Sequence, residues 1–451
     1  MNDTIVALAT PPGVGAIGVI RVSGNNTFPI LNKVFRGKDI TKAKSHSVHL
    51  GTIRDDEEII DEVLLTLFKG PNSYTKEDVI EISCHGSPFI IQQLIKLLLN
   101  QGARLARPGE FTQRAFVNGR FDLAQAEAVA DLIASENESM HSAAMKQMRG
   151  GFSDEIKKLR EELIHFASMI ELELDFAEED VEFASREDLR KLINNLKHLI
   201  RRLTESFTLG NAIKNGIPTV IAGKPNAGKS TLLNALLNEE KAIVSDIPGT
   251  TRDVIEDVIN VDGISFRFTD TAGIRTTKDT VEAIGVERTM AKMKEASVIL
   301  YLVDMQAETR KDVDKEINFI RELNVPYLLI GNKLDEAKPE IKLQLEEHDA
   351  LFISAIQKDN LENLKSALKE LVSLDSFKTG NTIVTNLRHY EGLMATDQAL
   401  NQVIEGIDSG ISNDFVAMDI RNALHHLGTL TGEITTEDLL ENIFSKFCIG
   451  K

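Results

Sequence analysis

The chain has 451 residues, 42% of them hydrophobic, and a formal net charge of −18 at pH 7. The length allows about three domains. Two cysteines, Cys84 and Cys448, are too few for a disulfide framework and too far apart for a metal-binding spacing, which favours a reducing compartment such as the cytoplasm. We expect neither secretion nor a membrane span, because the first residues lack a basic start and a long apolar run and no later segment is apolar enough. The acidic charge argues against a broad nucleic-acid surface, so any RNA contact has to be local or shared with a partner.

The first part of the chain alternates short apolar runs with Gly and Pro, as in TIVALAT, AIGVIRV and DVIEISCHG. Such runs predict strands. The following run PFIIQQLIKLLLNQG has apolar residues at helical spacing and ends at Gly102. We therefore expect an α+β domain at residues 1–118.

The segment between Pro108 and Pro218 contains no proline, and it places apolar residues three and four apart in LAQAEAVADLIASE and LRKLINNLKHLIRRL. This pattern predicts long amphipathic helices. The end of the chain has the same character, whereas strands and helices alternate between the two helical stretches. We predict one discontinuous all-helical domain, residues 119–215 plus 375–451, interrupted by an inserted α/β domain, residues 216–374.

The inserted domain opens with TVIAGKPNAGKSTLLNALL, in which an apolar strand leads into G-x-x-x-x-G-K-S and then into a periodic helix. This is the phosphate loop of P-loop NTPases in its expected context, which argues against a plain strand-to-helix turn. Backbone N–H groups and the helix N-terminus favour phosphate there. Lys229 is expected to reach the β- and γ-phosphates, and Ser230 to bind magnesium.

Further segments follow in the order of a GTPase: DTAG at 270–273, NKLD at 332–335, and SA at 354–355, each after a predicted strand. The carboxylate of Asp335 can accept both N–H groups of the guanine edge, and adenine offers no such pair of donors. A lone N-K-x-D is weak evidence, but the ordered set is specific. It predicts a Ras-like α/β GTPase domain.

Between the phosphate loop and DTAG lies SDIPGTTRD, in which Thr251 is the expected switch threonine. We expect magnesium on Ser230 and Thr251. The residues expected to bind GTP are Asn226, Ala227, Gly228, Lys229, Ser230, Thr231, Ser245, Asp246, Ile247, Pro248, Gly249, Thr250, Thr251, Asp270, Thr271, Ala272, Gly273, Asn332, Lys333, Asp335, Ser354 and Ala355.

The residue after D-x-x-G departs from the Ras pattern, because Ile274 stands where Ras-like GTPases carry a glutamine that orients the attacking water. Polar assistance to hydrolysis must then come from another residue. Glu282, in DTVEAIGVERT, is the nearby candidate catalytic carboxylate. The alternative for Glu282 is a first-turn helix residue that complements the helix dipole.

Over nearly its full length the chain resembles the MnmE (TrmE) family of tRNA-modifying GTPases. The segments PGEFTQRAFVNGR, DLAQAEAVADLI and FCIGK are the specific part of the resemblance. It implies an N-terminal domain that dimerises and binds a tetrahydrofolate, in its 5-formyl or 5,10-methylene form. It also implies a homodimer that forms a heterotetramer with the flavoprotein MnmG (GidA), the carrier of FAD and NADH. Together they would add a carboxymethylaminomethyl or aminomethyl group at C5 of wobble uridine 34 of certain tRNAs.

The resemblance further implies that GTP hydrolysis depends on potassium and on pairing of two GTPase domains across the nucleotide. The expected potassium ligands are Asn226, Ser245, Ile247 and Thr250. The ion would sit where an arginine finger acts in other GTPases. Glu282 matches the water-orienting position of the family, which explains how Ile274 is tolerated.

The positions that match the folate-binding residues of the family are Arg21, Glu81, Arg120 and Lys451. The chemistry is consistent, because the pterin edge offers N–H donors to a carboxylate and the glutamyl tail offers carboxylates to cations. Relatives often carry lysine at position 120, and arginine keeps the charge with a different donor geometry. Taken singly, each of these residues is more often a plain surface charge.

In the terminal FCIGK, Cys448 is the fourth residue counted from the end. A prenyl anchor fits poorly, because Gly450 and Lys451 replace the aliphatic and terminal residues of that signal. A frayed tail is the general expectation for a terminus. The family resemblance instead places the tail beside the folate pocket, with Cys448 as a candidate catalytic residue. The sequence does not decide whether Cys448 is a nucleophile, since its thiolate needs a cationic neighbour and Lys451 is only a candidate.

Two other functions fit the GTPase motifs. One is a ribosome-assembly switch without covalent chemistry, although such proteins typically add a basic RNA-binding module and this acidic chain has only the RLARPGEFTQRAFVNGR cluster. The other is a dimerising scaffold whose GTPase controls association. The modification state of tRNA in a deletion strain separates both from the modification enzyme.

Overall fold

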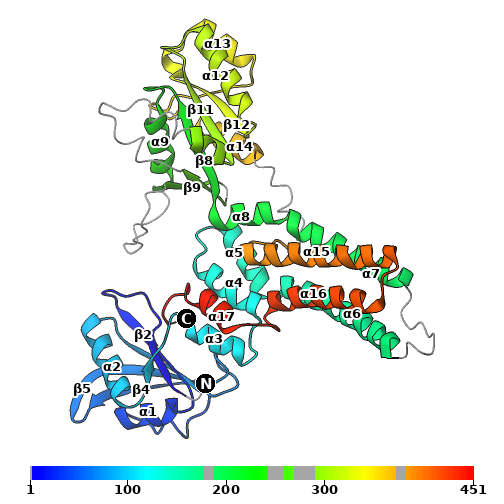
Figure 1. Ribbon diagram of the computed structural model, residues 1–451. Helices are drawn as coiled ribbons and strands as arrows, with labels where there is room; N and C mark the ends of the chain where they lie inside the picture. Colours follow the sequence, from blue (N-terminus) through cyan, green and yellow to red (C-terminus); the bar gives the residue numbers. More distant parts are fainter. Residues whose placement is uncertain are drawn as a thin grey trace. The chain divides into compact units, whose positions relative to one another are not determined.

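The computed structural model describes residues 3–175, 186–241, 257–261, 263–268, 290–371 and 382–450, and Figure 1 shows their elements along the chain. The chain divides into two compact units. The first comprises Met1–Ala134, Ala144–Ile200 and Glu391–Lys451, and the second comprises Ser135–Ala143 and Arg201–Tyr390. The finer partition at residues 118, 215 and 374 stays a prediction.

The first unit begins with a seven-stranded sheet in the order β3-β4-β5-β6-β2-β1-β7. The strands are antiparallel except that β7 pairs in parallel with β1. They are β1 (Ile5–Leu8), β2 (Ile17–Ser23), β3 (Phe35–Arg36), β4 (Ser47–Asp55), β5 (Glu58–Phe68), β6 (Val79–His85) and β7 (Arg104–Leu105).

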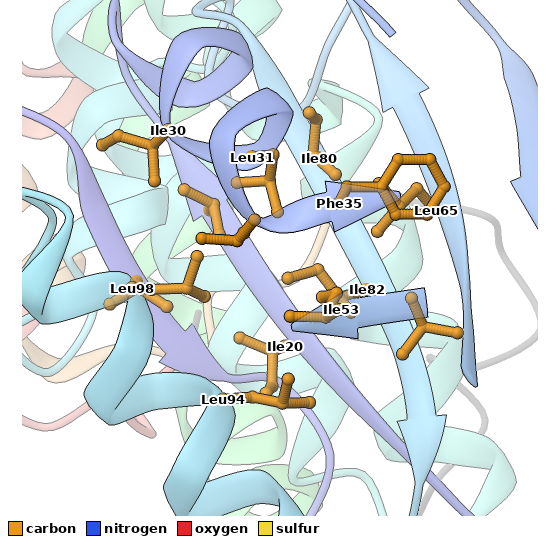
Figure 2. Packing of buried hydrophobic residues seen from close by; sticks show 14 of the residues in the cluster. Ile20, Ile30, Leu31, Phe35, Ile53, Leu65, Ile80, Ile82, Leu94 and Leu98 are labelled. Atoms are coloured by element: carbon orange, nitrogen blue, oxygen red, sulfur yellow. The ribbon is translucent and has the colours of Figure 1, made fainter. Parts of the chain in front are cut away.

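One face of this sheet packs against α1 (Thr27–Val34) and α2 (Pro88–Asn100). Strands β5 and β6 alternate buried and more exposed residues, as expected where one sheet face is covered. Figure 2 shows residues of this core, with Leu31, Leu94 and Leu98 from the helices among strand residues that include Ile20 and Ile82. Helix α2 begins with a proline in its first turn and Gly102 follows its end with φ +100°, in agreement with the predicted stop.

Helices make up the rest of the first unit. They include α3 (Glu110–Val117), α4 (Leu123–Ile133), α6 (Gly151–Asp175), α16 (Asn413–Thr431) and α17 (Glu437–Phe444), while α5 (Glu138–Met148), α7 (Arg186–Glu205) and α15 (Leu387–Ser409) run across the unit boundaries. Helix α16, from the end of the chain, packs on α6 and α4. Asp122 and Gln125 form a capping box that fixes the start of α4. No described helix is both long and apolar enough to cross a bilayer.

The second unit contains a six-stranded sheet in the order β13-β12-β11-β8-β10-β9, parallel except for the β9–β10 pair. Its strands are β8 (Ile217–Gly223), β9 (Asp257–Val261), β10 (Ile264–Phe268), β11 (Val298–Asp304), β12 (Tyr327–Asn332) and β13 (Leu351–Phe352). Its helices include α8 (Phe207–Asn215), α9 (Lys229–Lys241), α12 (Arg310–Glu322), α13 (Pro339–Glu346), α14 (Leu361–Leu371) and the short 3-10 helix η2 (Leu334–Glu336).

Helices cover both faces of this second sheet. Residues of α9 and α14 share one core with the strands, and residues of α12 and α13 share a second core with them. Strand β11 lies between β8 and β12 and is buried at every position, which accounts for its unbroken apolar run VILYLV. Loops that follow β8, β11 and β12 lie at the carboxyl edge of the sheet, where ligands bind in this type of fold.

Candidate functional site

The predicted phosphate loop lies between β8 and α9, at the carboxyl edge of the sheet. Gly228 takes φ +97°, and a Cβ at this position would lie 2.2 Å from Nδ2 of Asn332. Asn226 takes φ +64°, a left-handed value that asparagine tolerates better than most residues. The loop therefore holds a backbone shape that the glycine permits and that brings it against β12.

Lys229 spans this loop. Its Nζ donates to the backbone carbonyls of Gly223 and Lys224, both at 2.8 Å. Burial lowers the pKa of Lys229 below its ordinary value. Among the described residues, the hydrogen-bond partners of Lys229 Nζ are these two carbonyl dipoles, and an anionic phosphate would be a stronger partner. Ser230 follows in the first turn of α9, as the magnesium assignment requires.

Asn332 joins the phosphate loop to the guanine motifs. Its Nδ2 donates to the carbonyl of Ala227 at 2.7 Å, and its Oδ1 accepts from the backbone N–H of Ala355 at 3.1 Å. In the same region Ser354 donates from Oγ to Oδ1 of Asp335 at 2.7 Å. The structure thus brings the phosphate loop together with two guanine-motif segments that lie more than a hundred residues later in the sequence.

The lysine of NKLD is held by a residue that sequence analysis missed. Nζ of Lys333 lies 2.6 Å from Oδ2 of Asp304, a buried carboxylate at the end of β11. The other oxygen of Asp304 accepts from the backbone N–H groups of Gln306 and Ala307 at 3.0 and 3.2 Å. A polar residue at the end of an otherwise apolar strand was the signal that could have identified it.

Several predicted site residues lie outside the described residues, so the structure does not place them. They are Ser245, Asp246, Ile247, Pro248, Gly249, Thr250, Thr251, Asp270, Thr271, Ala272, Gly273, Ile274, Glu282 and Lys451.

The predicted folate residues lie on the first sheet and beside it. Arg21 and Glu81 face each other across β2 and β6, and Nε and Nη2 of Arg21 donate to Oε1 of Glu81 at 3.0 and 2.7 Å. Cζ of Arg21 lies 5.1 Å from the centroid of the Tyr74 ring. Arg120 lies against the same ring at 5.0 Å and donates to the carbonyl of Ser73 at 2.7 Å. Tyr74, which sequence analysis missed, therefore contacts both cations.

The C-terminal tail reaches the cluster of Arg21, Glu81, Arg120 and Tyr74, which we call the cation site because two of its side chains are cations. Nη1 of Arg21 donates to the carbonyl of Gly450 at 3.3 Å, and the carbonyl of Cys448 accepts from the N–H of Gly109 at 3.4 Å. Phe444 and Phe447 are buried in a cluster with Leu123. The frayed-tail interpretation is therefore wrong up to Gly450. Cys448 itself is exposed, and both cysteines are free thiols.

Comparison with known proteins decides the family. A family model described as the MnmE helical domain matches residues 123–448, and one described as the N-terminus of GTP-binding protein TrmE matches residues 4–120. The tRNA modification GTPase MnmE of Cytophaga hutchinsonii is 59% identical over 451 residues, which cover 100% of this chain and 98% of that protein. The chain belongs to the MnmE family. The protein of the same name from Flavobacterium psychrophilum is 53% identical, with 100% of this chain and 99% of that protein covered.

Membership of the MnmE family confirms the predicted resemblance, the predicted fold class and the assignment as a GTPase. The individual site residues stay predictions. Among the described ones, the structure brings the phosphate-loop and guanine-motif residues together. It also places Arg21 and Arg120 against Tyr74, with Glu81 paired to Arg21.

Proposed function

We propose that this GTPase acts in tRNA modification by adding the carboxymethylaminomethyl or aminomethyl group at C5 of wobble uridine 34, with a tetrahydrofolate as the one-carbon donor. The observation that carries the proposal is the full-length match to MnmE proteins together with a cation site at the C-terminal tail. The proposal includes a homodimer and a heterotetramer with the flavoprotein MnmG, which would hold FAD and NADH. It also places the protein in the cytoplasm.

The residues around Tyr74 have the chemistry that a folate requires. A pterin presents N–H donors, and Glu81 supplies an acceptor whose geometry is fixed by Arg21. The glutamyl carboxylates need cations, and Arg120 and Lys451 are the proposed partners. The bound folate would supply the one-carbon unit. The chain's own residues orient it, with Cys448 on the exposed side of the tail as the proposed catalytic residue.

Folate binding is tested directly by titrating the full-length protein with 5-formyltetrahydrofolate. We expect Glu81→Gln to weaken binding by about tenfold or more, because a buried donor of the pterin loses its charged acceptor. The control is Glu62→Gln, an exposed carboxylate on the neighbouring strand β5. Equal affinity of the wild type, Glu81→Gln and Glu62→Gln would exclude Glu81 as a ligand.

For GTP hydrolysis we propose that Ser230 and Thr251 bind magnesium and that Asn226, Ser245, Ile247 and Thr250 bind potassium. Of the proposed potassium ligands only Asn226 lies among the described residues; it is exposed, and an amide oxygen suits a cation. A bound potassium ion would supply positive charge at the transferred phosphate. Glu282 would orient the attacking water.

Kinetics test this mechanism. We expect potassium to accelerate GTP turnover relative to sodium and to promote pairing of GTPase domains, and equal rates in the two salts would contradict the role of the ion. We expect Glu282→Ala to lower kcat much more than nucleotide affinity, because water orientation contributes in the transition state. A proportional loss of affinity would point instead to a structural role.

The function as a whole is tested by analysing tRNA from a deletion strain. We expect wobble uridine to lack the carboxymethylaminomethyl group and a plasmid copy to restore it. If this uridine carried the same modification in the deletion strain as in the wild type, and ribosomal subunit profiles were altered, a ribosome-assembly switch would be favoured instead.

A further inference from the structure

Lys224, the first variable residue of the phosphate loop, directs its side chain to helix α12 and the turn before it. Nζ of Lys224 lies 2.5 Å from Glu308, 2.8 Å from Glu316 and 3.7 Å from Asp312. Three carboxylates thus share one ammonium group. The three carboxylates lie outside the phosphate and guanine motifs.

Two of the three carboxylates are buried. The side chains of Glu308 and Glu316 are 7% and 8% exposed. Burial raises the pKa of Glu316, and the nearby Glu308 raises it further. Burial alone would lower the pKa of Lys224, but its pairs with Glu308 and Glu316 raise it. Lys224 therefore compensates the negative charge of this cluster of three carboxylates.

The backbone of Lys224 belongs to the phosphate site itself. Its carbonyl accepts the hydrogen bond from Nζ of Lys229 at 2.8 Å. The contacts of the Lys224 side chain with Glu308 and Glu316 therefore fix its backbone carbonyl, which accepts the hydrogen bond from Nζ of Lys229. A shift of Lys224 away from α12 moves the partner of Lys229.

The segment before α12 also contacts Lys333 of the guanine motif. The N–H of Glu308 donates to the carbonyl of Asp304 at 3.0 Å, and Asp304 holds Lys333. The short segment from Asp304 to Glu308 thus contacts Lys224 at one end and Lys333 at the other.

We propose that Lys224 is a positioning residue for GTP: it neutralises Glu308 and Glu316 beside the phosphate loop and fixes the carbonyl that orients Lys229. Without Lys224, the remaining negative charge of the Glu308–Glu316 pair would lie uncompensated next to a loop that has to accept a polyanion. The resulting repulsion grows with the charge of the nucleotide, because Coulomb energy is proportional to the product of the charges. A structural defect in the loop would weaken all guanine nucleotides alike.

The test compares binding of GTP, GDP and GMP to the full-length protein by calorimetric titration. We expect Lys224→Met to weaken GTP by about tenfold, GDP by less, and GMP by less than about threefold. Lys224→Arg keeps the charge and should stay within about threefold of the wild type for all three. Lys311→Met is the matched control, since it removes a lysine charge from an exposed position of α12.

A rescue experiment separates charge from packing. Adding Glu308→Gln and Glu316→Gln to Lys224→Met removes the uncompensated carboxylates, and we expect it to restore most of the lost GTP affinity. Turnover gives a second readout: KM should rise in Lys224→Met while kcat changes less than about threefold, because substrate and transition state carry the same phosphates. An equal loss for GTP, GDP and GMP, or a triple variant no better than Lys224→Met, would overturn the proposal.

Discussion

The buried guanidinium of Arg114 offers the sharpest test of how the N-terminal region is held together. Its side chain is 1% exposed and donates to the carbonyl and Oδ1 of Asp3 at 2.8 and 2.7 Å, to Oε2 of Glu77 at 3.1 Å and to Oε1 of Glu110 at 3.1 Å. Glu110 is fully buried and also accepts from Arg104. A fifth hydrogen bond goes to Oε1 of Glu77 at 3.2 Å. Replacing Arg114 with Met removes all five and leaves the charge of the buried carboxylates only partly compensated.

Breaking a buried ion pair costs about 3 kcal/mol at the lower end of measured values. We use this lower value because Glu110 keeps its two hydrogen bonds from Arg104, at 2.6 and 3.0 Å, in the variant. Each 1.4 kcal/mol changes an equilibrium tenfold, so Arg114→Met should open helix α3 on the order of 100 times more often. Hydrogen exchange of peptides from β1 and α3, measured by mass spectrometry on the full chain, reports this opening.

Arg107 supplies a matched control, because it pairs with the same carboxylate from an exposed position. Its Nε lies 4.0 Å from Oε2 of Glu110 and its side chain is 71% exposed. Exposed pairs contribute at most about 1 kcal/mol, so Arg107→Met should accelerate exchange by less than about fivefold. Equal acceleration in Arg107→Met and Arg114→Met would refute the argument from burial.

The pH dependence has a defined sign. Burial alone would raise the pKa of Glu110, but hydrogen bonds from Arg104, from the N–H of Arg107 and from Arg114 outweigh it and lower the pKa. A carboxyl group with a lowered folded-state pKa stabilises the fold above its unfolded pKa, and this contribution is lost as pH falls through the folded value. The difference in exchange between wild type and Arg114→Met should therefore be full at neutral pH and shrink in acid.

Three further outcomes can be checked in the same protein. Gly228→Ala should lower GTP affinity on the order of 100-fold, as measured by titration, because its Cβ would lie 2.2 Å from the Asn332 amide and φ is +97°; an affinity within about threefold of wild type would contradict this. Asp335→Asn should lower the affinity for GTP by a comparable factor without a matching gain in affinity for ATP, because the amide cannot accept both guanine N–H groups. Retained GTP affinity would argue against the guanine assignment. Iodoacetamide at pH 8 should label Cys448 and spare Cys84, because burial, with the nearby Asp61, raises the pKa of Cys84 to about 11; mass spectrometry of tryptic peptides would show the reverse if this reasoning is wrong.

The fold was predictable from the sequence wherever periodicity was strong. The apolar run of β11, the strand-loop-helix signature at Gly228 and the apolar spacing of α2 each specify a local structure that tertiary contacts leave unchanged. The helical stretches on either side of the inserted sheet were also found, because long segments without proline and with a 3.6-residue period have few alternatives. The division into two units was not foreseen, since α5, α7 and α15 cross the unit boundaries without a break in their helical pattern.

The candidate sites were predictable only in part, because motifs identify residues that touch the nucleotide and not those that hold them. Asp304, Glu308 and Glu316 lie far from the phosphate loop in sequence, and their role follows from contacts with Lys333 and Lys224. A buried carboxylate in an amphipathic helix has no sequence signature, because Glu is common on exposed faces of helices.

Both candidate sites depend on a glycine at which two distant segments meet, and this makes each site a property of the tertiary fold. At the nucleotide site, Gly228 allows the loop to lie against Asn332, so that the guanine motif and the phosphate loop share hydrogen bonds. At the cation site, a Cβ on Gly450 would lie 2.2 Å from the carbonyl oxygen of Leu8, and the φ of Gly450 is +93°. Any larger residue would displace the tail and withdraw the carbonyl that Arg21 contacts. The tail therefore packs on the N-terminal sheet, and the carbonyl of Gly450 reaches Arg21 only when the tail is docked there.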